Sequence, residues 1–133
     1  MKSFYKVFTI IAILFLTACT KDKINKNKVD KSLTGNDSGK MTAVIKGQTI
    51  SVTLGNPGDG GYQFNDPHFS TSVLNLVEHS HKDGNSEMTG DFGKDTWIFK
   101  ASETGTTTLE ITASRSWEPN SSVPIFSGQI TVK

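Results

Sequence analysis

The sequence predicts an all-β fold, and three observations support this prediction. Apolar and polar residues alternate over several short segments after residue 40, as they do in half-buried strands. Clusters of Gly, Asn, Asp and Pro, which favour turns, separate these segments. No window in this part of the chain repeats its apolar residues with the period of a helix.

About seven strands are expected, each identified by its apolar residues. The first two flank the turn 46–48, the third follows a Gly-rich loop, and the others are separated by turn residues. In chain order, they carry Ala43 and Ile45; Ile50, Val52 and Leu54; Tyr62 and Phe64; Val73–Val77; Trp97, Phe99 and Ala101; Leu109, Ile111 and Ala113; and Phe126, Ile130 and Val132. This pattern predicts an immunoglobulin-like antiparallel β-sandwich, with a small barrel as the alternative.

The N-terminus has the features of an export signal. Lys2 and Lys6 precede an apolar run of about ten residues, Val7–Leu16, which is too short to span a bilayer core of ~30 Å. The segment 16–19 (Leu-Thr-Ala-Cys) resembles a bacterial lipobox, which implies cleavage before Cys19 and diacylation of its thiol. We therefore expect a lipoprotein signal peptide over residues 1–18 and a membrane lipid anchor at Cys19. The expected location is the bacterial cell envelope, periplasmic or surface-exposed; the alternative is an ordinary signal peptide with a chance cysteine.

The net charge differs in sign between the N-terminal part of the chain and the expected domain. Residues 1–40 carry eight Lys and three Asp, a balance of +5, whereas residues 41–133 carry five Lys, one Arg and ten acidic residues, a balance of −4. Residues 19–40 are polar and lack apolar periodicity, so we expect a flexible tether there, with binding to anionic lipid headgroups as a weaker alternative. The domain over residues 41–133 is a poor candidate for nucleic-acid binding, because it lacks clustered cations. We expect a monomer that needs no cofactor and, since Cys19 is the only cysteine, no internal disulfide.

Three loops of the expected domain carry candidate recognition residues. Gly55–Tyr62 combines a proline with glycines that permit positive φ, but it lacks the Gly-Lys-Ser/Thr of a phosphate-binding loop. Asp83–Lys94 has no apolar run and holds Phe92 next to a glycine. Ser114–Pro119 contains an Arg and a Trp, which are frequent interface anchors. The alternatives are an ordinary turn in the first loop, a Phe92 that folds back on the core, and a Trp117 that covers the end of the sandwich.

In this order, the loops resemble those of the chagasin family of cysteine-protease inhibitors. That family has an Asn-Pro-Thr-Thr-Gly-Tyr-like loop, then a Gly-x-Gly-Gly loop, then an Arg-Pro-Trp loop. The matching residues are Asn56, Pro57, Gly61 and Tyr62, then Gly90 and Gly93, then Arg115, Trp117 and Glu118. Lys100–Leu109 also resembles the strand-turn-strand before the family's last loop, and the resemblance covers residues 41–133.

The resemblance implies a reversible, non-covalent inhibitor of papain-like cysteine proteases and not an enzyme. Its three loops would enter the active-site cleft from one end of the sandwich, the first near the catalytic thiolate and the others on either side. Trp117 would supply apolar contact, and Tyr62 would anchor the base of the first loop. The residues implied at the interface are Asn56, Pro57, Gly58, Asp59, Gly60, Gly61, Tyr62, Gly90, Asp91, Phe92, Gly93, Arg115, Ser116, Trp117 and Glu118.

The sequence departs from the family pattern in each loop. The first loop is one residue longer and holds Asp59 and Gly60; the second has Phe92, and the third has Ser116, where the pattern has Gly and Pro. We expect the longer first loop and the missing proline to loosen the binding surface, because ordering mobile loops costs affinity.

No catalytic or metal site is expected. His79 and His81 lie on one face of an expected strand, near His68 and Glu78, but no second pair of ligands has the spacing of a closed zinc site. We therefore favour a solvated strand face. Calcium is disfavoured because no loop has the ligand density of a known calcium motif. The acidic residues concerned are Asp59, Asp91 and Asp95.

Two other functions are compatible with the sequence. One is a surface lipoprotein adhesin or carbohydrate-binding module that uses an exposed Trp117. The other is a structural subunit of the envelope that uses the edge of the sandwich. An inhibition assay with a papain-like protease separates both from the inhibitor interpretation.

Overall fold

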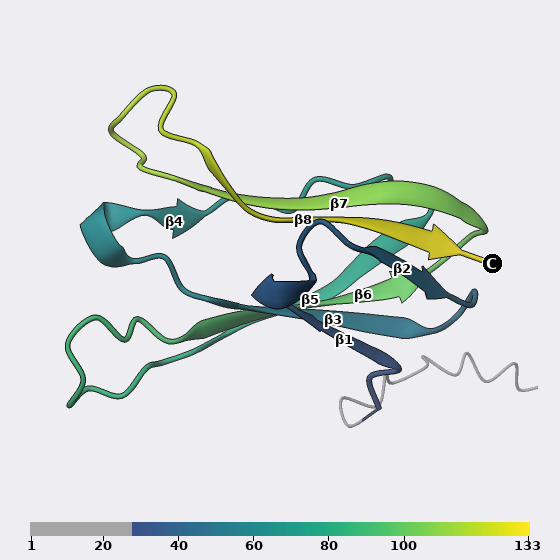
Figure 1. Ribbon diagram of the computed structural model, residues 1–133, viewed down its shortest axis with the longest axis horizontal. Helices are drawn as coiled ribbons and strands as arrows, with labels where there is room; N and C mark the ends of the chain where they lie inside the picture. The colour runs from purple at the N-terminus through teal and green to yellow at the C-terminus, as the bar shows by residue number, and fades with distance from the viewer. Residues whose placement is uncertain (1–27) are drawn as a thin grey trace, which may run out of the picture.

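The structure is a computed structural model that describes residues 28–133 (Figure 1). The predicted signal peptide and the predicted lipid on Cys19 lie outside the described residues. Within residues 28–133, no helix is long and apolar enough to cross a membrane.

Two four-stranded sheets pack against each other, with strand orders β1-β3-β6-β5 and β2-β8-β7-β4. This confirms the all-β sandwich, with eight strands where about seven were expected. Two 3-10 turns, η1 (Gly35–Asp37) and η2 (Asp59–Gly61), complete the elements. The strands are β1 Lys31–Thr34, β2 Met41–Val44, β3 Thr49–Gly55, β4 Gln63–Phe64, β5 Leu74–Lys82, β6 Lys94–Ala101, β7 Gly105–Ser114 and β8 Val123–Val132.

The sheets are mixed and not wholly antiparallel, which corrects one part of the prediction. β1 pairs parallel with β3, and β2 pairs parallel with β8. Parallel neighbours need a long connection between them. Here the chain from β1 to β3 passes through β2 in the other sheet, and nearly the whole domain separates β2 from β8.

The predicted tether is wrong for its last residues, because β1 belongs to the first sheet. Leu33 is only 3% exposed and joins the core. Asp30, just before β1, accepts a hydrogen bond from the Thr49 N–H (2.8 Å) and donates its own N–H to the Thr49 carbonyl (3.1 Å). One apolar residue in a polar segment creates no alternation, so the sequence pattern did not reveal this strand.

The inward face of β2 also differs from the prediction. Thr42 and Val44 are buried, whereas Ala43 is exposed and Ile45 lies in the turn after the strand, 63% exposed. Residues 41–45 carry apolar side chains at both parities, so their alternation is ambiguous. Val44 pairs with Val132 on β8, and Val132 is itself buried. This pairing turns the side chains of Val44 and Thr42 toward the core.

The core lies between the sheets and follows the predicted alternation on β3, β6 and β7. Trp97 and Phe99 of β6 are completely buried, and the Trp97 ring meets the Phe64 ring edge-on at a centroid distance of 4.8 Å. Among the described residues, every buried side-chain nitrogen or oxygen has a hydrogen-bond partner. The sandwich therefore offers a well-packed support for its loops.

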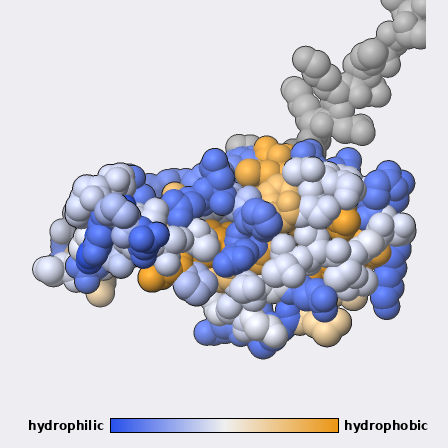
Figure 2. Space-filling model, turned by 90° about the horizontal axis from the view of Figure 1, so that it is seen from above, coloured by the Kyte–Doolittle hydropathy of each residue, from blue (hydrophilic) through white to orange (hydrophobic). Residues whose placement is uncertain are grey.

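The connections after β3, β5 and β7 project from the end of the sandwich opposite the C-terminus (Figure 1). β3 and β5 both run antiparallel to β6, so they end at the same side of their sheet. Figure 2 shows that this end, on the left, is largely hydrophilic when seen from above.

Candidate functional site

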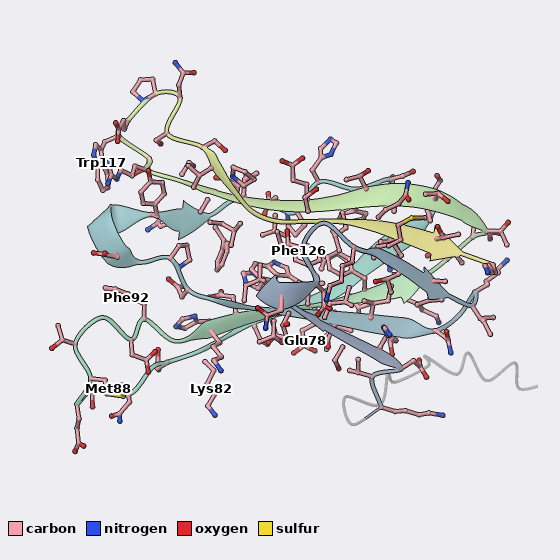
Figure 3. The ribbon with its side chains drawn as sticks, in the orientation of Figure 1. Glu78, Lys82, Met88, Phe92, Trp117 and Phe126 are labelled. Atoms are coloured by element: carbon pink, nitrogen blue, oxygen red, sulfur yellow. The ribbon has the colours of Figure 1, made fainter. Side chains whose placement is uncertain are left out.

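Three loops that are far apart in the sequence form one surface at this end (Figure 3). We call them the first loop (Asn56–Tyr62, between β3 and β4), the second loop (Asp83–Gly93, between β5 and β6) and the third loop (Arg115–Ser122, between β7 and β8). All fifteen residues that the family resemblance implied at an interface lie in these loops.

The first loop turns back on itself at η2, where the Gly61 N–H donates to the Gly58 carbonyl (3.2 Å). Gly60 and Gly61 have φ angles of 65° and 78°, in the left-handed region that favours glycine. A Cβ atom on Gly61 would lie 2.1 Å from Cη2 of Trp117. The third loop therefore packs directly on this turn, and the prediction that glycines allow positive φ is confirmed here.

Arg115 joins the third loop to the first. Its Nε donates to the Gly60 carbonyl (2.8 Å), its Nη1 donates to the Glu118 carboxylate (2.8 Å), and the guanidinium lies 4.5 Å from the centroid of the Tyr62 ring. The hydrogen bond to Glu118 raises the pKa of Arg115, against a smaller opposing effect of burial, so the group stays charged. Tyr62, expected to anchor the base of the loop, is half-buried beneath this group.

Two exposed aromatic side chains flank the first loop (Figure 3). Trp117 is 68% exposed beside Gly61, and Phe92 is 43% exposed beside Gly58. The structure thus decides between the alternatives for both residues: neither lies in the core. The tryptophan that fills the core is Trp97.

The second loop is tied to the first and is also shaped from within. The backbone N–H of Asn56 donates to the Gly93 carbonyl (2.9 Å). The Asp91 carboxylate accepts the backbone N–H groups of Asn85 (2.8 Å) and Gly93 (3.0 Å). These two hydrogen bonds, the one from Asn85 being the stronger influence, lower the pKa of Asp91. Asp91, implied at an interface, therefore holds its own loop in shape.

At the base of the first loop, the carboxylate of Asp95 accepts three hydrogen bonds. The donors are Asn56 Nδ2 (2.7 Å), His79 Nε2 (2.9 Å) and His81 Nδ1 (3.0 Å). Only 6% of the Asp95 side chain is exposed. The imidazole of His79 also stacks on the Trp97 ring, with a centroid distance of 4.6 Å and an interplanar angle of 8°.

The expected solvated face is confirmed for His79 and His81, whose side chains are 44% and 41% exposed, but the cluster adds a partner that was not predicted. The two histidines do share one face of β5, but both are bound to Asp95 on the neighbouring strand. Sequence reasoning missed the role of Asp95, although a signal was present. Asp95 has the same parity as the inward residues Trp97 and Phe99, and a carboxylate at a buried position needs partners.

The described residues contain no group of three or more His, Cys, Asp or Glu side chains placed to hold a metal ion. His68 lies apart from the other two histidines, because its backbone bridges to Glu110 in the second sheet. Asp91 and Asp95, considered for calcium, are each engaged by the donors described above.

A hollow of about 410 Å³ lies against the first loop, with Trp117 on its wall and Asp95 in its lining. Its lining mixes aromatic and polar groups and includes no Ser, Thr or Cys. The residues are Asn56, Gly58, Gly61, Tyr62, Gln63, Phe64, His79, Asp95 and Trp117. The geometry offers aromatic contact area and backbone hydrogen-bonding groups, which suits recognition of another molecule.

Residues 43–132 match the model of a protein family described as "Chagasin family peptidase inhibitor I42". Among curated protein sequences, none matches this chain significantly.

Similar solved structures extend over most of the chain. The cysteine protease inhibitor EhICP2 from Entamoeba histolytica has 19% identity and a TM-score of 0.60, covering 78% of this chain and 98% of its own. Amebosin has 21% identity and a TM-score of 0.53, with coverage of 77% and 97%. PbICP-C, solved in complex with falcipain-2, has 13% identity and a TM-score of 0.52, with coverage of 77% and 99%. At these identities, the likeness shows a shared fold.

Proposed function

The chain belongs to the chagasin family of peptidase inhibitors, and from this premise we propose that it is a reversible, non-covalent inhibitor of papain-like cysteine proteases. Two proteins of the same fold support this class of target: one is a cysteine protease inhibitor, and the other was solved bound to falcipain-2. The proposed mode of action is occlusion of the active-site cleft by the three loops.

The observation that carries this proposal is the placement of the first loop. It projects between Trp117 and Phe92, and both neighbouring loops hold it through hydrogen bonds. A narrow loop with exposed aromatic groups on both sides has the shape of a wedge for a cleft. In this arrangement the first loop fills the cleft, and the aromatic side chains contact its walls.

The contacts within the loop surface favour tight binding, because a loop already held in place loses little entropy when it binds. Arg115 bonds Gly60, and Gly93 bonds Asn56, so the first loop is fixed on two sides. The expectation that the longer first loop and Ser116 loosen the binding surface stays a prediction. The contacts described here act against such loosening.

Inhibition without cleavage follows from the backbone of the same loop. Proteolysis requires a peptide bond aligned with the catalytic thiolate at a distance of ~3–3.5 Å. The 3-10 turn with left-handed Gly60 and Gly61 is not an extended segment, and the fixed neighbours oppose its extension. We therefore expect the loop to occupy the cleft and to leave it intact.

The test is an inhibition assay with the purified full-length protein and papain-like proteases, alongside a serine protease and a metalloprotease as specificity controls. Trp117→Ala is expected to weaken inhibition about thirtyfold, which corresponds to ~2 kcal/mol for a buried interface anchor. The matched control is Ile45→Ala, since Ile45 is also highly exposed but lies at the end of the sandwich away from the three loops. The neighbouring Lys46 donates its backbone N–H to the carbonyl of Lys133 at that end. This control should leave the inhibition constant unchanged.

Melting temperatures of both variants show whether each is folded. Absence of inhibition of several papain-like enzymes at micromolar concentration would refute the proposed function and favour the adhesin or carbohydrate-binding alternative. A folded Trp117→Ala variant that inhibits as well as the wild type would refute the role of the third loop.

We further propose that the inhibitor is a lipid-anchored protein of the bacterial cell envelope. The supporting features are the charged start, the short apolar run and the lipobox-like segment that ends at Cys19. The tether would then extend from Cys19 to the residues before β1. Such an anchor would restrict the inhibitor to proteases that reach the same membrane surface.

A further inference from the structure

The Asp95 carboxylate connects three parts of the chain that have different roles. It lies near the start of β6, opposite Leu54 of β3 on one side and His81 of β5 on the other. Its Oδ2 accepts from Asn56, the first residue of the first loop, at 2.7 Å. Because Asp95 is nearly buried and belongs to a central strand, this bond attaches the loop to the rigid part of the sandwich.

The charge of Asp95 is retained over a wide pH range. Burial by itself would raise its pKa, but the hydrogen bonds from His81, Asn56 and His79 outweigh this effect, so the pKa of Asp95 lies below its ordinary value of 3.8. Protonation of Asp95 would give the carboxyl group a donor of its own and compete with the three bonds it accepts.

The protonation state of His81 changes the strength of the cluster. Its Nδ1 lies 3.0 Å from Asp95 Oδ2, and its Nε2 lies 3.3 Å from Asp83 Oδ1. A neutral imidazole carries only one N–H, so only the protonated ring donates to both carboxylates. The hydrogen bond to Asp95, followed by the charges of Asp95 and Asp83 against an opposing effect of burial, raises the pKa of His81 above 6.5.

The direction of the pH effect follows from these two shifts. The stabilisation from His81 is fully present below its ordinary pKa of 6.5 and is lost as the pH rises through its higher value in the folded protein. The stabilisation from Asp95 is lost only when the pH falls below 3.8. The cluster is therefore strongest in mildly acidic solution. The other titratable groups that face the cluster are His79 from β5, Asp83 from the turn after it, and Tyr62 from the first loop, with Arg115 of the third loop over the Tyr62 ring.

We propose that Asp95 is a positioning residue that holds the first loop through Asn56, and that protonation of His81, which then donates to both Asp95 and Asp83, fixes the Asp95 carboxylate more firmly beneath the loop in mildly acidic solution. The consequence for inhibition rests on the proposed function; the structural part does not. Neutral His81 still donates one hydrogen bond from Nδ1, so the loop is held less firmly at higher pH and is not released.

The first experiment follows the free full-length protein by NMR between about pH 4.5 and pH 8. The side-chain amide signals of Asn56 are expected to shift with the same midpoint as the His81 ring. His81→Asn keeps a short amide donor near Nδ1 but does not titrate, so the Asn56 shift at that midpoint should be lost. His68→Gln is the matched control, because His68 is exposed and paired with the second sheet; this variant should behave as the wild type. Asn56 signals that do not follow His81, or that move equally in His81→Asn, would overturn the proposal.

The second experiment measures the inhibition constant of a papain-like protease over the same pH range. The ratio of the constants for His81→Asn and the wild type cancels the titration of the enzyme itself. We expect the variant to be about threefold or more weaker at acidic pH, the effect of losing one charge-assisted hydrogen bond at the loop base, and to equal the wild type near pH 8. Asp95→Asn should weaken inhibition at every pH, with its fold checked by circular dichroism.

The outcomes separate this inference from the proposed function. If the wild type inhibits but the ratio does not change with pH, the pH-dependent hold is refuted and the inhibitor function stands. If no variant inhibits, the function is refuted, and the NMR titration alone decides whether Asp95 and His81 hold the first loop.

Discussion

Gly61→Ala tests the packing of the first loop against the third. A Cβ atom on Gly61 would lie 2.1 Å from the end of the Trp117 side chain, and the residue has a φ of +78°. The left-handed backbone costs an alanine about 1–2 kcal/mol. The indole is exposed and free to move, so the overlap itself adds little to the folding cost. The expected loss of stability is therefore ~1–2 kcal/mol, and each kcal/mol lowers the melting temperature of a domain of this size by roughly 4–8 °C.

The effect on inhibition should exceed what the backbone strain alone produces. An indole displaced from its place beside the first loop cannot act as an interface anchor, so we expect about thirtyfold weaker inhibition, or ~2 kcal/mol. Gly47→Ala is the matched control, because Gly47, in the turn after β2, has a φ of +90° but no atom within 4 Å of the point where a Cβ would lie. It should lose similar stability and retain full inhibition.

The assay pairs thermal unfolding with inhibition constants for both variants and the wild type. Equal losses of inhibition in Gly61→Ala and Gly47→Ala would show that backbone strain alone acts, and would refute the argument from Trp117. Unchanged inhibition by a folded Gly61→Ala protein would refute it as well.

Three further predictions address the remaining contacts and the anchor. Arg115→Lys should weaken inhibition about fivefold, because a lysine cannot bond Gly60 and Glu118 as the planar guanidinium does. An inhibition constant equal to that of the wild type would contradict the proposal that Arg115 holds the first loop in place. Ser116→Pro should tighten inhibition about twofold to fivefold, because the bond from the Glu118 N–H to the Arg115 carbonyl (3.2 Å) places Ser116 at the second position of a turn, where proline is favoured; weaker binding by a folded variant would count against this. Cys19→Ser should move the protein from the membrane fraction to the soluble fraction, as detected by fractionation, and continued membrane association would argue against lipidation.

Much of the strand pattern was predictable because every second side chain of a strand points to the same face of its sheet. Trp97 and Phe99 on β6 and Leu109 on β7 were placed correctly from this local period. The prediction failed where the period was absent or ambiguous. Leu33 stands alone in a polar strand, and Val44 competes with apolar neighbours of the opposite parity.

By itself, the sequence determined the all-β class and the order of the three candidate loops along the chain. Both are local properties: alternation follows from the geometry of one strand, and the loop residues occur within short segments. The family resemblance added the expectation that these loops share one end of the sandwich.

Only the tertiary structure decided how the loops are held. Asn56 meets Asp95 across 39 residues of sequence, and Arg115 reaches Gly60 across 55. These contacts exist because β3 and β6 are neighbours in one sheet, while the other sheet brings the third loop beside the first. Such pairings depend on strand order and register, which arise from the packing of the whole core and not from any single segment.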